Sequence, residues 1–248
     1  MHKILAVALL TGALSASLAA GPILGTFTID GSVSVTATGI TWTSNTSVHD
    51  QATISSLGLT GSFVGMANQI IGIHDLTDTP GNQPVGVSFP NFDFIDFPVA
   101  SGDPSLLANF FALGSGNPAN CSTNPALAAA GQTCTLTPST TPAESGGSPF
   151  TFLNTSNGSG GCCNSSATWD ISGITADGLS RFNAVFDSNF TSSYQTVLNN
   201  FATNGSVSDA FAGDLTVSIQ GIPEPTTMAL MGTGLILLSL GFRRRKRS

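Results

Sequence analysis

Apolar and polar residues alternate along much of the chain from Gly25 onward, a pattern typical of β-strands with one buried face. The first such stretch ends at Thr43, and its apolar phase changes at Thr38-Gly39. A phase change at a glycine predicts a bulge or a turn between two strands. Five apolar side chains share one face before that point: Phe27, Ile29, Val33, Val35 and Ala37.

Further strands are expected where the alternation returns later in the chain. Asp177-Gly178 has the composition of a hairpin turn between two of them. The stretch 114–161 is rich in Gly, Asn, Pro, Ser and Thr, which predicts long loops around short strands at 134–136 and 150–152. The remaining strands are expected at 85–89, 91–97, 169–171, 182–186 and 207–219.

Two segments have helical spacing instead. The apolar residues within 106–111 predict a short helix, and those within 194–201 predict another, which begins after Ser192-Ser193 and ends at Asn204-Gly205. Many short strands with few helices, and no repeat of about 20–50 residues, favour an all-β fold. We expect an antiparallel β-sandwich or a jelly-roll-like body with one or two short helices.

The N-terminus has the pattern of a secretory signal peptide. Lys3 provides the positive charge, and an apolar run follows from Ile4 to Leu14. Ser17 and Ala19 then satisfy the small-residue rule of signal peptidase, which predicts a signal peptide over residues 1–20. An uncleaved anchor helix is the alternative, but the run is short for one that spans a membrane.

The C-terminus has three consecutive parts. Ile222-Pro223-Glu224-Pro225 precedes an apolar stretch, Thr226 to Phe242. These seventeen residues would rise about 25 Å as a helix, enough for a minimal transmembrane span. A basic cluster follows and should stay in the cytoplasm, so 226–242 is expected to anchor the body outside the inner membrane, with 243–248 inside. The cluster that should stop transfer is Arg243, Arg244, Arg245, Lys246 and Arg247.

This order of triplet, helix and basic cluster resembles the PEP-CTERM sorting domain of Gram-negative bacteria that make exopolysaccharide. The resemblance covers residues 222–247 and implies that an exosortase, a membrane cysteine transpeptidase, recognises Pro223, Glu224 and Pro225. Ile222 replaces the valine common before the triplet. Tails of this kind also carry an ice-binding C-terminal domain label, which describes the tail and is no evidence that the body binds ice. Without exosortase processing, the tail would be an ordinary single-pass anchor.

The body between the two ends is strongly acidic. Residues 21–222 hold thirteen acids and one Lys or Arg, Arg181, a net charge of about −12. Nucleic acid is therefore excluded as a partner, because one cation cannot neutralise a row of phosphates. The chain contains sixteen Phe and many Val and Ile, too much apolar material for a disordered protein. We expect residues 21–221 to form one exported domain.

All four cysteines lie in the exported part, where disulfides are stable. Three pairings are possible among Cys121, Cys134, Cys162 and Cys163. Because a bridge between the adjacent Cys162 and Cys163 needs a strained ring, the crossed pairing is favoured. Zinc is disfavoured because adjacent cysteines rarely supply two tetrahedral ligands.

Catalytic residues are not predicted. His49-Asp50 and His74-Asp75 are neighbours that should point to opposite faces on a strand and so cannot pair. No Gly-x-Ser-x-Gly motif accompanies them. Asp93 and Asp96 are three apart and should also face opposite ways, which argues against a two-carboxylate glycosidase.

Metal sites and cofactors are not predicted either. A calcium site is the alternative to the absence of a metal. Its oxygen ligands would come from Asp75, Thr77, Asp78 and Thr79. No EF-hand or glycine-aspartate repeat supports it.

The expected function is that of an exported protein without catalytic activity. Signal peptidase and exosortase are the expected processing enzymes, and the inner membrane is a transient partner. The body should reach the cell surface or the exopolysaccharide matrix. Two alternatives remain, a secreted polysaccharide hydrolase and a carbohydrate- or ice-binding module that uses threonine arrays such as Thr26-x-Thr28 and Thr36-x-Thr38.

Overall fold

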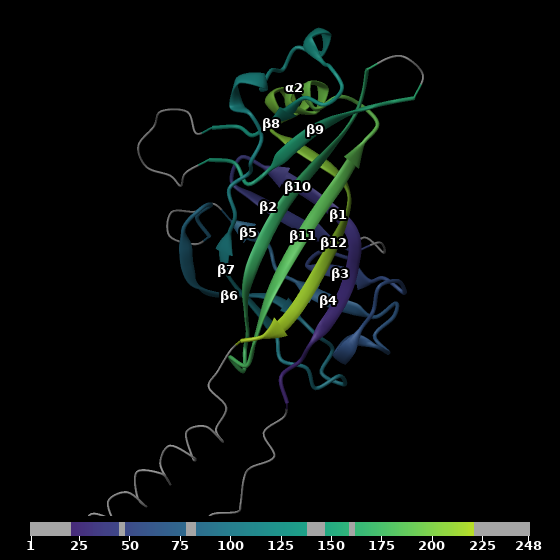
Figure 1. Ribbon diagram of the computed structural model, residues 1–248, viewed down its shortest axis with the longest axis vertical. Helices are drawn as coiled ribbons and strands as arrows, with labels where there is room; N and C mark the ends of the chain where they lie inside the picture. Colours follow the sequence, from purple (N-terminus) through teal and green to yellow (C-terminus); the bar gives the residue numbers. More distant parts are fainter. Residues whose placement is uncertain (1–20, 45–47, 78–82, 138–146, 159–161, 221–248) are drawn as a thin grey trace, which may run out of the picture.

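The computed structural model describes residues 21–44, 48–77, 83–137, 147–158 and 162–220 (Figure 1). Twelve strands, one α-helix and three short 3₁₀ helices occur within these residues. The predicted signal peptide and the sorting tail lie outside them. Among the helices in the described ranges, none has the length and apolar character needed to cross a membrane.

Eight antiparallel strands form a closed ring. The ring closes because β11 pairs with β12 on one side and with β10 on the other. In spatial order it consists of β11 (Ser180–Phe190), β12 (Ser206–Ile219), β1 (Gly25–Thr36), β3 (Gln51–Ile54), β4 (Ile70–Ile73), β6 (Ser88–Asp96), β7 (Leu106–Phe111) and β10 (Cys162–Thr175).

Four shorter strands extend this ring. β2 (Gly39–Thr43) pairs with β1 and carries β5 (Leu76–Thr77). β9 (Thr151–Ser156) pairs with β10 and carries β8 (Thr133–Cys134). Three 3₁₀ helices pack on these elements: η1 (Gly61–Phe63) on β1, η2 (Pro118–Asn120) on β8, and η3 (Pro125–Leu127) on the α-helix.

The body is therefore a closed barrel, and the predicted sandwich or jelly roll is wrong in this respect. The all-β, antiparallel part of the prediction is confirmed. Alternation along a strand shows that one face is buried, but a sandwich and a barrel bury that face equally well. Closure depends on pairings such as Trp169 with Phe186 and Phe186 with Gly213, between strands whose register no local pattern specifies.

Aromatic rings fill the middle of the barrel. Trp42 lies 5.0 Å from the ring centres of both Phe186 and Phe211, and Phe186 stacks on Trp169 at 5.5 Å. Glycine makes room for these rings, because a Cβ at Gly213 would meet the Phe186 ring at 2.6 Å. The interior of an eight-stranded barrel is just wide enough for such side chains.

Three local predictions are confirmed. The phase change at Thr38-Gly39 is the turn between β1 and β2, and Asp177-Gly178 lies in the turn between β10 and β11. The predicted helix is α2 (Tyr194–Asn204), whose N-cap Ser193 accepts a hydrogen bond from the backbone N–H of Thr196. Gly205 ends it in the left-handed conformation, which suits glycine.

The helix predicted over 106–111 is wrong, because this segment is strand β7. Its buried residues, Leu106, Ala108 and Phe111, face the core while its backbone pairs with both β6 and β10. Pairing on both sides satisfies the backbone hydrogen bonds that a helix would have made internally. The spacing is helix-like because both pairings contain register shifts.

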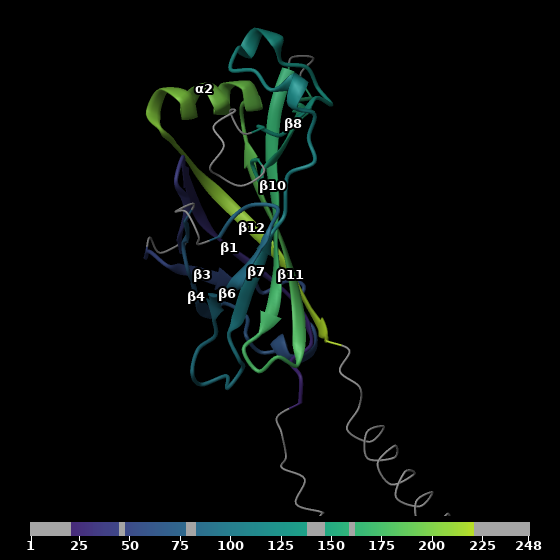
Figure 2. The same cartoon turned by 90° about the vertical axis from the view of Figure 1, so that its left-hand side faces the viewer.

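The two ends of the described body leave the barrel together. Gly25, the first residue of β1, pairs with Val217, two residues before the end of β12. We call this the terminal end of the barrel. The opposite end carries α2 and β8 (Figures 1 and 2), and we call it the helix end.

Candidate functional site

A cavity of about 410 Å³ lies at the helix end of the barrel. Most of its wall is apolar, and small-molecule pockets of roughly 300–1,000 Å³ are common in the mouths of β-barrels. The strands and the helix contribute side chains from opposite directions. They include Val33 and Val35 of β1, Ala167 and Trp169 of β10, and Val197 and Leu198 of α2.

Sequence reasoning missed this cavity. In the sequence, the apolar lining residues look like ordinary core positions. The space between them exists only once the ring of strands is closed. One feature of the sequence could have indicated the cavity. Ala167 and Trp169 are successive inward residues of β10, and the small alanine leaves space next to the large tryptophan.

Two clusters of histidine and aspartate lie elsewhere on the barrel, and each brings one imidazole and two carboxylates within 4.8 Å of one another. The His49 cluster consists of His49, Asp50 and Asp75. The His74 cluster consists of His74, Asp93 and Asp96. Because His74 and Asp75 are adjacent in the segment between β4 and β5, that segment contributes to both clusters.

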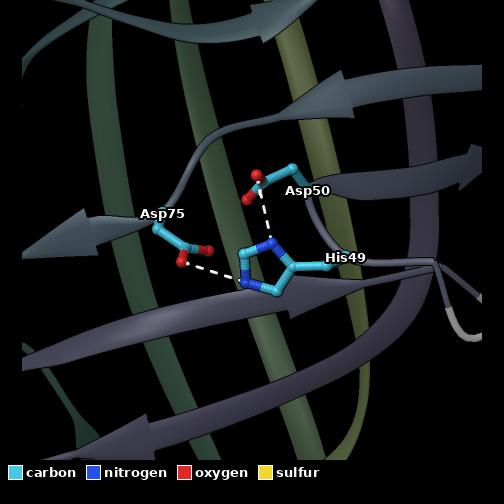
Figure 3. Close-up of side chains that lie close together, drawn as sticks. All are labelled: His49, Asp50 and Asp75. Atoms are coloured by element: carbon cyan, nitrogen blue, oxygen red, sulfur yellow. Dashed lines mark ion pairs between the residues drawn. The ribbon is translucent and has the colours of Figure 1, made fainter.

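In the His49 cluster the imidazole lies between two carboxylates (Figure 3). Nδ1 is 3.1 Å from Asp50 Oδ2, and Nε2 is 3.2 Å from Asp75 Oδ2. A neutral imidazole donates from one nitrogen only, whereas the protonated ring donates from both. The prediction that His49 and Asp50 cannot pair is wrong, since Asp50 adopts a left-handed conformation with φ of 57°.

Asp75 also supports the barrel core. Its Oδ1 accepts a hydrogen bond of 3.1 Å from the backbone N–H of Trp42, the fully buried ring at the centre of the aromatic cluster. Burial raises the pKa of the Asp75 carboxyl, while the Trp42 N–H and His49 act in the opposite direction. The calcium alternative used this same carboxylate, but Asp78 and Thr79 lie outside the described residues.

In the His74 cluster, Nε2 of His74 is 2.9 Å from Asp96 Oδ2, and Ser105 donates to the other oxygen of Asp96. Burial alone would raise the pKa of Asp96, but the hydrogen bonds from His74 and Ser105 bring it below its ordinary value. Burial, followed by the charge of Asp96, raises the pKa of Asp93.

The expectation that Asp93 and Asp96 face opposite ways is wrong. β6 shifts register against β7 between Asp93 and Ile95, and this irregularity changes which face the following residues occupy. A nitrogen and several carboxylate oxygens are a donor set that divalent transition metals accept. Both clusters offer that set, and both also contain carboxylates that accept hydrogen bonds from other parts of the protein, from the Trp42 backbone in one and from Ser105 in the other.

The cysteines pair as neighbours. Cys121 is bonded to Cys134, with the two Cα atoms 5.1 Å apart, and Cys162 is bonded to Cys163. The favoured crossed pairing is wrong. Cys134 is buried in β8, and η2 packs against that strand, which brings Cys121 next to it.

The disulfide between Cys121 and Cys134 therefore belongs to the helix end of the barrel. The hydroxyl of Tyr194, the first residue of α2, donates to the carbonyl of Asn120 one residue before Cys121. The loop, the disulfide and α2 thus form one small packed layer, whose buried residues include Cys134, Phe152 and Tyr194.

Comparison with known proteins identifies the C-terminus. A family model for the PEP-CTERM protein-sorting motif matches residues 221–246. No curated protein and no solved structure matches the chain. The predicted sorting motif, with Pro223, Glu224 and Pro225, falls inside the matched range, as does the basic cluster from Arg243 to Lys246. The chain therefore carries a PEP-CTERM motif, which implies an exported protein that an exosortase sorts.

Proposed function

We propose that the barrel is a surface or exopolysaccharide-matrix protein without catalytic activity, delivered by signal peptidase and an exosortase. The observation that carries this proposal is the position of the sorting motif. Strand β12 ends at Ile219, and the matched motif begins at residue 221. Processing near Pro223-Glu224-Pro225 would therefore leave all twelve described strands in the released body.

The geometry of the barrel suits transient anchoring. Because β1 begins beside the end of β12, the tail follows directly from the terminal end of the barrel. The helix end lies at the far side of the barrel (Figure 2). It holds the cavity and the disulfide between Cys121 and Cys134. While the tail holds the protein in the inner membrane, the cavity would face away from it.

The cavity supports a binding role over hydrolysis. Glycoside hydrolysis needs two carboxylates on either side of the bond to be cleaved. Among the described residues that line the cavity, Asp209 is the only acid. The pair Asp93 and Asp96 lies outside the cavity lining and shares one histidine.

The ice-binding alternative receives no support from the pair Thr26 and Thr28. Thr26 donates to the carbonyl of Gly58, and Thr28 donates to Asp214. These hydroxyls serve contacts within the protein, and Thr26 also hydrogen-bonds to Thr60. A flat array for ice needs hydroxyls that are free to meet water.

The test of the proposal is fractionation in a host that has an exosortase. Replacing Pro223-Glu224-Pro225 by alanines should retain the protein in the inner membrane, while the unmodified protein appears in the extracellular or matrix fraction. The control replaces Thr226, Thr227 and Met228 by alanines, the same number of changes next to the motif, and should be sorted normally. Identical fractionation of the triplet variant and the unmodified protein would refute exosortase sorting.

A further inference from the structure

We propose that the cavity at the helix end binds a small, uncharged, mostly apolar molecule that carries a hydrogen-bond acceptor. The proposal concerns what the body binds and does not depend on how it is sorted. Its basis is a pair of buried polar groups that have no partner in the described part of the protein. They belong to two cavity-lining residues, Trp169 and Ser188.

The indole nitrogen Nε1 of Trp169 and the hydroxyl of Ser188 are both without a hydrogen-bond partner, although each residue is only 2% exposed. A buried tryptophan N–H usually finds an acceptor, and an unpaired buried polar group costs free energy. Such a group in a native protein calls for an explanation, and an absent ligand or water supplies one.

The strand register places Trp169 and Ser188 on the same, inward face of two adjacent strands. Ser188 of β11 pairs with Ala167 of β10, and Trp169 is the next inward residue of β10. Both side chains therefore belong to neighbouring inward positions of adjacent strands. Ala167 is opposite Ser188 and two residues before Trp169, and its side chain is only a methyl group. Most of the cavity wall around these residues is apolar.

The chemistry of the wall defines the class of ligand. The indole N–H is a donor only, and the serine hydroxyl is able to donate as well. A carbonyl or ether oxygen would accept from both. Val33, Val35, Val197 and Leu198 would surround the remainder of the ligand with apolar surface.

The charge of the wall excludes anions. Among the described lining residues Asp209 is the only charged one, and Arg181, the only Lys or Arg between residues 21 and 222, is not among them. A carboxylate ligand would lose its hydration without gaining a cation, which is strongly unfavourable. Fatty acids are therefore excluded, and neutral ketones, esters or quinone-like molecules fit.

A matched series of probes tests the proposal. Residues 21–220 hold all the described strands, α2 and both disulfides, and cooperative thermal unfolding of each protein sample confirms its fold. Nile red, a neutral dye with a carbonyl group, should bind at one site per molecule with increased emission. 2-Acetylnaphthalene should displace it, and 2-naphthoate at pH 7.5 should be at least about tenfold weaker. Naphthalene serves as the probe without an acceptor.

Two variants locate the site. Ala167→Phe should fill the cavity and abolish dye binding, whereas Ser166→Phe, the neighbouring position on the other face of β10, should leave it unchanged. Ser188→Ala should weaken the binding of 2-acetylnaphthalene roughly fivefold and leave the binding of naphthalene unchanged. Only 2-acetylnaphthalene has a carbonyl oxygen that would lose the hydrogen bond from Ser188. Ser166→Ala is its control.

Several results would overturn the proposal. The proposal is wrong if the folded protein does not bind Nile red. It is also wrong if 2-naphthoate and 2-acetylnaphthalene displace the dye equally well. Unchanged dye binding by a folded Ala167→Phe variant would place the dye elsewhere. If that variant does not fold, the selective effect of Ser188→Ala decides the matter, and equal losses for both naphthalene probes would refute the assigned hydrogen bond.

Discussion

The carboxylate of Asp75 accepts a hydrogen bond of 3.1 Å from the backbone N–H of Trp42. This bond joins the His49 cluster to the centre of the barrel, because Trp42 packs against Phe94, Trp169, Phe186 and Phe211. The other oxygen of Asp75 contacts His49. A side chain that is partly open to solvent thus holds the backbone of a fully buried tryptophan.

Replacing Asp75 by alanine should therefore destabilise the barrel. The Trp42 N–H would lose its acceptor and His49 would lose one carboxylate, at a cost of about 1–3 kcal/mol in the free energy of unfolding. Asp50→Asn is the control, because asparagine tolerates the left-handed backbone at this position. It removes the other carboxylate of the same cluster, which is more exposed, and should cost less than about 1 kcal/mol. Urea unfolding measures both, and equal losses would contradict the role given to Trp42.

The free energy of unfolding should decrease at acid pH, because Asp96 becomes protonated there. Its pKa lies below the ordinary value of 3.8, so its contribution is present above pH 3.8 and is lost as the pH falls through the lower, folded value. The raised pKa values of Asp75 and Asp93 act in the opposite sense, because protonation favours their folded forms. Asp96→Asn should therefore lose less stability between pH 5 and pH 3 than the unmodified protein does.

That difference is measured by thermal unfolding across the same pH range. Asp103→Asn, at an acid outside the cluster, is the control for the loss of one carboxylate. Parallel curves for Asp96→Asn and the unmodified protein would show that His74 and Ser105 do not favour the ionised form of Asp96.

The two disulfides should contribute unequally. Cys121 and Cys134 are thirteen positions apart, and closing a loop of about this size stabilises a protein by roughly 3 kcal/mol. The adjacent Cys162 and Cys163 close almost no chain, so their bridge should contribute much less. Serine at both positions of each pair, tested by urea unfolding, measures the contributions. A larger loss from the 162–163 pair would contradict this ranking.

Gly213 should tolerate no side chain. A Cβ there would lie 2.6 Å from the ring of Phe186, which is fully buried and packed against the rings of Trp42, Trp169 and Phe211. Gly213→Ala should cost about 1–3 kcal/mol through overpacking. Gly21→Ala is a suitable control because that position has open space around it. A thermal midpoint unchanged in both variants would mean that the aromatic centre is looser than the structure shows.

Much of the secondary structure followed from local chemistry. The alternation in β1, the Asp177-Gly178 turn and the α2 segment between Ser193 and Gly205 each carry their signal within a few residues. Ring closure did not, because it depends on β11 pairing with both β10 and β12. The helix expected over 106–111 failed for the same reason, since pairing on two sides outweighed the local spacing.

The candidate sites show the same division. The sorting motif is read from consecutive residues, so the sequence was enough to predict it. The histidine clusters depend on a left-handed Asp50 and on an irregularity in β6, neither of which the alternation reveals. The cavity depends on residues from β1, β10, β11 and α2 meeting across a closed ring.

We propose that the barrel is exported and then cut from its tail by an exosortase. The most direct measurement is the intact mass and terminal peptides of the protein recovered from the extracellular or matrix fraction of a host with that enzyme. We predict an N-terminus near Gly21 and a C-terminus close to Pro223-Glu224-Pro225, with the basic cluster absent. A recovered protein that still ends in Arg243 to Ser248 would contradict the claim and would make the tail an ordinary membrane anchor.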